Sequence, residues 1–297
     1  MTKFTILLTT LALTLTLAPA AAHAADSSAA RAGAAWLSVA VKPGADGMAA
    51  DAIVAMRAAG RLPAAEAARR ARALRAGASG YARTAGATGK TILALAAARS
   101  GSARCAGKTD LLTRLQSYGR AGRYGNTVFD QTLAMLAARA LHAGPSQKAI
   151  DVLLGARGAG GWNFNLTRSG GRADDVTSTA MAILAARAAG VPARNGTLRA
   201  GLRWLRAQRT AAGGFALGRR DRNEANSTAL AIEAAGAMGS RDTRATRALA
   251  SLQRSGGAFQ FTRDDAGSRV LASNDAVVAL SGRRLPVTTL NRTPGRC

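Results

Sequence analysis

The chain contains six copies of a two-part segment, and this repeat limits its fold more than any other feature. In the first part Arg, Gln and Ser alternate with Leu and Trp, and a glycine-rich turn and an aromatic residue follow. The best copy has Arg199-Ala200, Trp204-Leu205, Gln208 and Gly213-Gly214-Phe215. Similar copies lie at 31–37, 148–162 and 244–259, with weaker ones at 66–81 and 111–125. Biased composition alone does not place glycine–aromatic turns at such spacings, so a repeat architecture is expected.

Each copy continues into a second segment that is apolar on every side. These segments are 50–60, 90–101, 130–144, 175–190, 224–239 and 272–282. They start near Ser, Thr, Asp or Asn, which cap helix N-termini, and they end in Gly, which suits a helix C-terminus. Because a helix that is apolar all round is buried, each repeat predicts one inner helix and one half-exposed outer helix. Aligning Ala52, Thr91, Thr132, Thr179, Thr228 and Asp275 gives separations of 39, 41, 47, 49 and 47 residues.

Composition agrees with an all-α ring of six helix pairs. Hydrophobic residues make up 48% of the chain, mostly Ala, and aromatic residues only 4%. Ala favours close-packed helices, whereas a β-sandwich needs more β-branched and aromatic residues.

The N-terminus reads as a signal peptide over residues 1–24. Lys3 supplies the positive region, an apolar stretch follows, and Ala22-His23-Ala24 fits a cleavage site. An uncleaved anchor is the alternative. No second apolar run of spanning length follows, so we expect a secreted or otherwise extracytoplasmic protein with no transmembrane segment in the mature chain. In such a compartment the two cysteines, Cys105 and Cys297, favour one disulfide over two free thiols.

The formal net charge is +25 and comes almost wholly from Arg. Such a charge attracts polyanions, including nucleic acid, anionic glycans and cell-wall polymers. The arginines are spread over nearly every segment, however, and codon bias toward Ala, Arg and Gly is the stronger explanation of their number. Weak polyanion or cell-wall binding is therefore an expectation that charge alone does not localise.

The repeat resembles the QW motif of the squalene-cyclase and protein prenyltransferase superfamily, which reads basic–small, aromatic–aliphatic, Gln, then Gly-x-aromatic. The resemblance covers residues 30–282 and implies a terpenoid-cyclase-like α/α toroid over 25–285, followed by a tail at 286–297. It implies that the Gln side chains reach free N–H groups of a neighbouring helix. It also implies structural roles for the repeat aromatics, namely Trp36, Trp162, Trp204, Phe215 and Phe259.

The catalytic signatures of that superfamily are incomplete here. Cyclisation uses Asp-x-Asp-Asp, but the chain has only the pairs Asp174-Asp175 and Asp264-Asp265. Prenyl transfer uses zinc held by Asp-x-Cys and a distant His. No Asp-x-Cys occurs, and His142 is the single His after the predicted signal peptide. Neither a Cys-Gly-Glu-Gln thioester run nor a Gly-x-Ser-x-Gly elbow is present. We therefore expect no metal and no cofactor, and the sequence leans against catalysis.

The starts of the inner helices are the candidate ligand site, because their free N–H groups and polar side chains would converge at the mouth of an apolar funnel. The candidate residues are Asp130, Gln131, Asp175, Ser178, Thr179, Asn226, Ser227, Thr228, Asn274 and Asp275.

Three functions stay open at this point. The first is a non-catalytic protein that binds a small apolar ligand or a protein partner at this rim. The second is a divergent terpene cyclase or prenyl-processing enzyme that uses Asp174 and Asp175. The third is a glycan-active toroid that uses two rim carboxylates, drawn from Asp174, Asp175, Glu224, Asp264, Asp265 and Asp275.

Overall fold

The computed structural model describes residues 18–168, 174–217 and 222–297. Within these residues the chain forms twelve α-helices and one two-stranded antiparallel sheet. The inner helices are α2 (Gly47–Ala58), α4 (Ala85–Ala98), α6 (Val128–Ala140), α8 (Val176–Ala188), α10 (Ala225–Ala237) and α12 (Arg269–Leu280). The outer helices are α1 (Ala18–Ala40), α3 (Ala64–Tyr81), α5 (Leu111–Ser117), α7 (Gln147–Gly155), α9 (Gly196–Ala207) and α11 (Thr243–Ala250). The strands are β1 (Cys105–Ala106) and β2 (Thr109–Asp110).

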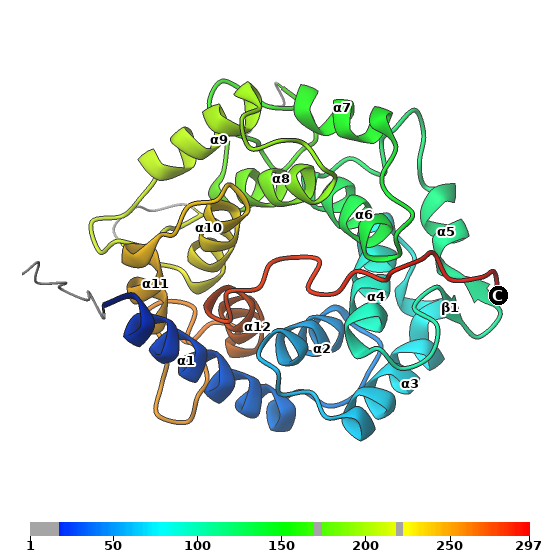
Figure 1. Cartoon of the computed structure of the whole chain (residues 1–297), viewed down its shortest axis with the longest axis horizontal. Helices are drawn as coiled ribbons and strands as arrows, with labels where there is room; N and C mark the ends of the chain where they lie inside the picture. Colours follow the sequence, from blue (N-terminus) through cyan, green and yellow to red (C-terminus); the bar gives the residue numbers. More distant parts are fainter. Residues whose placement is uncertain (1–17, 169–173, 218–221) are drawn as a thin grey trace, which may run out of the picture.

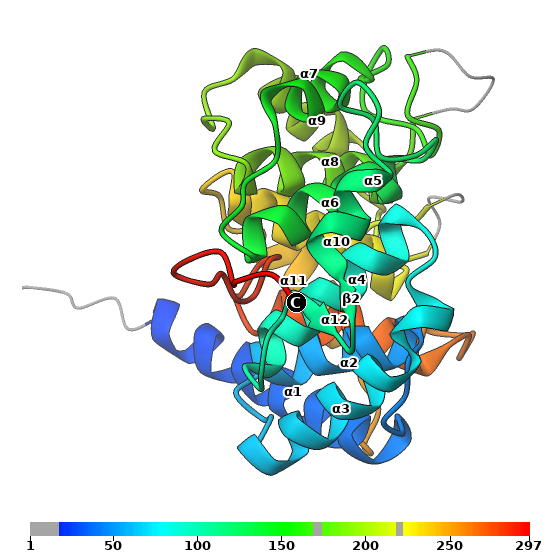
Figure 2. The same cartoon turned by 90° about the vertical axis from the view of Figure 1, so that its right-hand side faces the viewer.

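The helices form two concentric rings, which confirms the predicted α/α toroid (Figure 1). Each inner helix packs against the next, and α12 packs against α2, so the inner ring is closed. The outer ring surrounds it, with α1 lying beside α11 and α12 (Figures 1 and 2). All inner helices run in one sense, because each is followed by an outer helix that returns the chain. Their N-terminal ends therefore meet on one face and their C-terminal ends on the other.

Local sequence explains where the inner helices begin and end. Asp46, Thr84, Thr127, Asp175 and Ser268 each accept a hydrogen bond from a backbone N–H of the first turn, as N-caps do. Gly190, Gly239 and Gly282 follow three of the helices with positive φ, a conformation that glycine adopts without strain. Between these ends Ala, Leu, Ile and Met are buried on all sides.

The repeat aromatics fasten the two rings together. Trp162, Phe215 and Phe259 are fully buried at the glycine turns, as predicted. A hydroxyl of the following inner helix holds each turn by accepting from the backbone N–H of its aromatic residue. The bonds are Trp162 N–H to Thr179 Oγ1 (2.9 Å), Phe215 N–H to Thr228 Oγ1 (3.0 Å) and Phe259 N–H to Ser273 Oγ (2.9 Å).

The expected contact of the repeat Gln with helix N–H groups is wrong for Gln253. Its amide nitrogen instead donates to two carbonyl oxygens, of Ala29 at 2.8 Å and Gly257 at 2.9 Å. A glutamine amide can donate as well as accept, and the groups that face it here are acceptors.

The segment after α12 crosses the face formed by the C-terminal ends of the inner helices (Figure 1). Leu290 N–H donates to the carbonyl of Ala140 at the end of α6, at 2.8 Å. A disulfide joins Cys297 to Cys105 in β1, and Arg104 donates to the carbonyl of Pro294 at 3.0 Å. The tail is thus fixed at its far end.

The predicted signal peptide, residues 1–24, lies partly outside the described residues, and α1 begins at Ala18. Among the described helices, none combines the length and the apolar character that a membrane crossing requires.

Candidate functional site

The N-terminal ends of the six inner helices lie together on one face of the ring, which we call the N-terminal mouth. At its floor lies a polar cluster of four residues from four consecutive inner helices: Asn226 of α10, Asp275 of α12, Asp51 of α2 and Lys90 of α4. Lys90 Nζ lies 2.5 Å from Asp51 Oδ2, and Asn226 Nδ2 donates to Asp275 Oδ2 at 2.7 Å. The Asp51 and Lys90 side chains keep 22% and 29% exposure, so solvent can reach the cluster.

Burial and neighbouring charges shift the pKa values of Asp275, Asp51 and Lys90 differently. Burial raises the pKa of Asp275 to about 6, and neighbouring Asp51 adds to this effect against the opposing hydrogen bond from Asn226. Burial also raises the pKa of Asp51, although the Lys90 ammonium opposes that shift. Burial lowers the pKa of Lys90, but Asp51 outweighs it, so that the pKa of Lys90 is raised and the ammonium stays charged. The cluster therefore holds one ion pair beside a carboxyl that titrates near neutral pH.

Tyr81, the last residue of α3, borders the same floor. A methyl group added at Gly47 would lie 3.1 Å from the Tyr81 hydroxyl and 3.8 Å from Lys90 Nζ, so both groups face the start of α2. Burial raises the pKa of the Tyr81 phenol, which keeps it a neutral hydrogen-bond donor and acceptor.

Large apolar side chains border the mouth, and we call Met48, Phe164 and Leu217 the apolar rim. Their exposures are 38%, 40% and 56%, and the one other large hydrophobic residue with such exposure in the described chain is Val39, near the end of α1. Phe164 lies beside Phe129 of α6, with ring centroids 6.2 Å apart. Polar groups below an apolar border are the ordinary composition of a ligand site.

Several residues predicted to line the mouth are buried in its wall instead. Thr179 and Thr228 hold the aromatic turns, and Gln131 donates to the carbonyls of Gly122 and Ala149 while it accepts from Tyr124 N–H. Asn274 donates to the carbonyl of Met48 at 3.2 Å and is buried. Ser178 is also buried, and its hydroxyl has no partner among the described residues.

The acidic candidates on the other inner helices act mainly as caps. Asp175 accepts from Ser178 N–H at 2.7 Å, and Asp174 accepts from Gly160 and Gly161 N–H at 2.9 and 2.7 Å. These contacts supply structural roles for the two carboxylates that the cyclase alternative needs.

Asp130 and Ser227 bond to neighbouring cap residues. Asp130 accepts from Gly86 N–H at 3.0 Å and from the Thr127 hydroxyl at 2.8 Å. Ser227 donates to Glu224 Oε2 at 3.0 Å. Of the predicted residues, Asn226 and Asp275 are the two that meet in the polar cluster.

Sequence reasoning missed Asp51, Lys90 and Tyr81. A signal was available, because Asp51 and Lys90 are charged residues inside segments predicted to be buried. Charged side chains are seldom buried without a partner, so such a pair on neighbouring helices marks a site or an ion pair.

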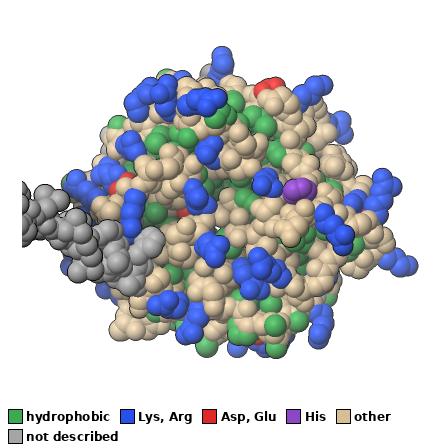
Figure 3. Space-filling view, viewed as in Figure 1, with side chains coloured by type: hydrophobic (Ala, Val, Ile, Leu, Met, Phe, Trp, Pro, Cys, Tyr) green, Lys and Arg blue, Asp and Glu red, His purple; other side chains and the backbone are tan. Residues whose placement is uncertain are grey.

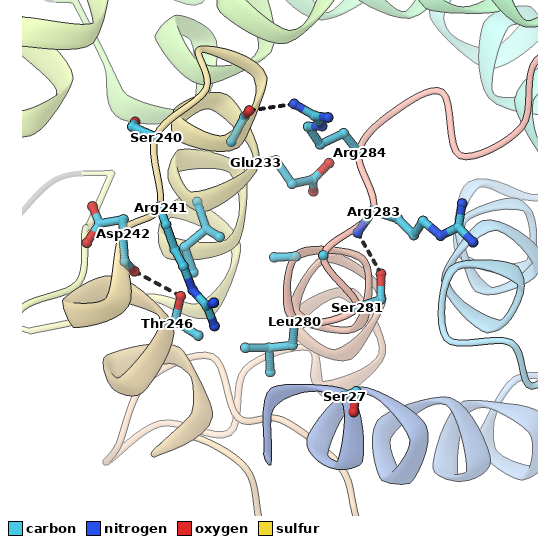
Figure 4. Close-up of a pocket in the computed structure, with 14 residues that line it drawn as sticks. Ser27, Glu233, Ser240, Arg241, Asp242, Thr246, Leu280, Ser281, Arg283 and Arg284 are labelled. Atoms are coloured by element: carbon cyan, nitrogen blue, oxygen red, sulfur yellow. Dashed lines mark hydrogen bonds between the residues drawn. The ribbon is translucent and has the colours of Figure 1, made fainter. Parts of the chain in front are cut away.

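The opposite side of the ring, which we call the C-terminal face, is different in charge. Figure 3 shows it with many Lys and Arg side chains and few Asp and Glu. A cavity of about 290 Å³ opens there between α10, α12 and α11 (Figure 4). Glu233 lies buried beside it, and burial raises the pKa of this carboxyl well above its usual range. The backbone N–H of Leu285 donates to the Glu233 carboxyl at 3.3 Å.

Among the described residues, no group of three or more His, Cys, Asp or Glu side chains could hold a metal ion. His142 lies just beyond the end of α6, where the sequence placed it.

The architecture defines the class of this protein as an all-α toroid of six inner and six outer helices within the described residues. No protein-family model matches the chain, and no curated protein matches it. Among solved structures, the chain is similar to a glycosidase in complex with glucose. The TM-score is 0.58 at 15% sequence identity, and the match covers 87% of this chain and 96% of that one. At this identity the likeness concerns the fold, and the resemblance to the squalene-cyclase superfamily stays a prediction.

Proposed function

We propose that the chain is an extracytoplasmic α/α-toroid protein that binds a carbohydrate at the N-terminal mouth. The observation that carries this proposal is the half-buried polar cluster beneath the apolar rim. A sugar presents hydroxyl groups, which donate and accept, and apolar C–H faces. Carboxylates, an ammonium and an amide match the hydroxyls, while the Phe164 and Met48 side chains match the C–H faces.

The same cluster disfavours the purely apolar ligand that the sequence suggested. Covering Lys90 and Asp51 with hydrocarbon would remove both charges from water without replacing their hydration. Such desolvation costs several kcal/mol. A hydroxylated ligand avoids this cost by hydrogen bonding. The similarity to a glucose-bound glycosidase supports the same ligand class, as an analogy of fold.

Location outside the cytoplasm is part of the proposal. It is supported by the predicted signal peptide and by the disulfide between Cys105 and Cys297, because disulfides persist in oxidising compartments.

The test is a binding screen of neutral oligosaccharides against the full chain, followed by calorimetric titration of the best ligand. Asp51→Asn and Asp275→Asn should each weaken binding about tenfold, since a charge-assisted hydrogen bond contributes on the order of 1.5 kcal/mol or more. Asp151→Asn is the matched control, because Asp151 is exposed on outer helix α7, whereas the cluster lies on inner helices. Absence of any oligosaccharide binding, or equal weakening by the control, would refute the proposal.

Glycoside hydrolysis is a second candidate, favoured by the two cluster carboxyls in unlike environments. Asp275, with its pKa near 6, would donate a proton to the leaving oxygen, and Asp51, paired with Lys90, would act as the carboxylate that retaining and inverting glycosidases require. Incubation of the bound oligosaccharide in H₂¹⁸O tests it. Isotope incorporation at the reducing end that Asp275→Asn abolishes supports hydrolysis, and an unchanged ligand leaves a binding protein.

A further inference from the structure

The C-terminal face holds a second cavity, of about 540 Å³, whose charged lining is entirely cationic in the described part of the chain. It lies between the ends of α6, α8 and α10 and the segment that follows α12. Arg139, Arg187, Arg283 and Arg284 line it, together with Thr289 and apolar side chains. Figure 4 shows the Arg283 side chain directed away from α10. We therefore attribute the charge of this cavity to the guanidiniums of Arg139, Arg187 and Arg284.

Two of these guanidiniums are held in place by backbone carbonyls. Arg187 Nε donates to Ala237 O at 2.9 Å, and Arg187 also donates to Val191 O. Arg284 donates to Gly236 O (Figure 4). Arg139, in the last turn of α6, makes no side-chain hydrogen bond or ion pair with any described residue. Its charge is therefore uncompensated in a half-buried position.

The helix ends do not cancel this positive charge. Each inner-helix C-terminus contributes about −0.5 of an elementary charge, so three ends contribute about −1.5. Three guanidiniums contribute +3, and two of them cover the very carbonyls that carry the negative end of α10. The cavity therefore has a surplus of positive charge, which a bound anion would reduce.

We propose that this cavity binds a phosphoryl group, carried as a diphosphate or on a polyphosphate chain. Guanidinium forks match tetrahedral oxyanions with paired hydrogen bonds, and a multiply charged ligand is needed to balance three cations. The Thr289 hydroxyl, also at the lining, supplies a neutral donor. This site is on the opposite face from the polar cluster and does not depend on carbohydrate binding there.

The test is calorimetric titration of the full chain with inorganic pyrophosphate at low salt. Arg139→Gln/Arg284→Gln should weaken binding at least tenfold. The control Arg72→Gln/Arg247→Gln lowers the net charge equally at exposed outer-helix positions and should weaken binding less than twofold. Arg139→Gln alone removes no hydrogen bond of the fold and should weaken binding about threefold. This single variant replaces the double variant if the double variant is unstable.

Further titrations distinguish a diphosphate from a polyphosphate chain and test whether net charge alone explains the binding. Long-chain polyphosphate should bind more tightly than pyrophosphate and lose the same factor in Arg139→Gln/Arg284→Gln, while acetate should not compete. Equal weakening in both double variants would show attraction to net charge alone and overturn the proposal. Failure of pyrophosphate to bind the unaltered protein would overturn it as well.

Discussion

The two faces of the ring are built from opposite ends of the same six helices, yet they carry different chemistry. At the N-terminal mouth, Asp46, Asp175 and other caps accept from free N–H groups, and Asp51 and Asp275 add carboxyls at the floor. At the C-terminal face, Arg187 and Arg284 donate to free carbonyls. Helix ends require acceptors on one side and donors on the other, so they sort the charges of the chain. A net charge of +25 thus conceals an acid-bearing floor.

The faces also differ in how they are closed. The tail crosses the C-terminal face and is bonded to it through the Cys105–Cys297 disulfide and the Leu290 N–H bond to α6. The mouth is bordered by exposed Met48, Phe164 and Leu217 instead. Under the proposed function, the mouth is the side on which a carbohydrate would bind.

Removing the tether should have the largest effect on stability and should leave the mouth intact. The disulfide spans 192 residues of sequence. Cys105→Ser/Cys297→Ser should lower the free energy of unfolding by about 2–5 kcal/mol, since a cross-link over a long loop restricts the unfolded chain. Urea denaturation measures the loss. Below the melting temperature, oligosaccharide affinity should stay within twofold, and a parallel loss of affinity would show that the tail supports the mouth.

Replacing Asp275 with Asn should stabilise the protein at neutral pH but hardly at acidic pH. Its pKa is raised to about 6 from 3.8, so the stability associated with the neutral carboxyl is complete below pH 3.8 and is lost as pH rises through 6. At pH 7.5 Asp275→Asn should therefore gain up to about 3 kcal/mol, and at pH 4 only about 0.5 kcal/mol. Urea denaturation between pH 4 and 8 checks this, with Asp264→Asn as reference. A gain that does not change with pH would contradict the assigned titration.

Matched truncations at the two ends of α8 compare the faces directly. Arg187→Gln removes charged hydrogen bonds to Ala237 O and Val191 O and should cost about 1.5–2 kcal/mol. Asp175→Ala removes the N-cap bond to Ser178 and should cost about 1 kcal/mol. Thermal melting of both variants gives the order. A larger loss for Asp175→Ala would mean that capping at the mouth carries more of the fold than the arginine contacts do.

The smallest effect is expected for the ion pair on the floor of the mouth. Lys90 and Asp51 are both partly exposed, so solvent weakens their attraction. A double-mutant cycle with Lys90→Met and Asp51→Asn should give a coupling of about 0.2–1 kcal/mol in stability. A coupling above 2 kcal/mol would show that the pair is structural rather than kept for a ligand.

The sequence predicts the rings well and the site only in part, for one physical reason. Capping residues and terminal glycines place the inner helices closely: the segment 175–190 contains α8, Val176–Ala188. A helix that is apolar on all sides has no polar stripe to fix its rotation about its own axis. The sequence therefore could not show that Thr179 turns outward to the Trp162 turn while Asp275 and Asn226 meet in the polar cluster. Likewise Lys90 and Asp51 are 39 residues apart, and only the packing of α4 against α2 brings them together.

Hydrogen exchange with and without the best oligosaccharide tests the central claim most directly. The account predicts slower exchange around Asp51 in α2, Lys90 in α4 and Asp275 in α12, with no change in the tail at 283–297. Slower exchange confined to the tail and the inner-helix C-termini would place the ligand on the opposite face and contradict the account.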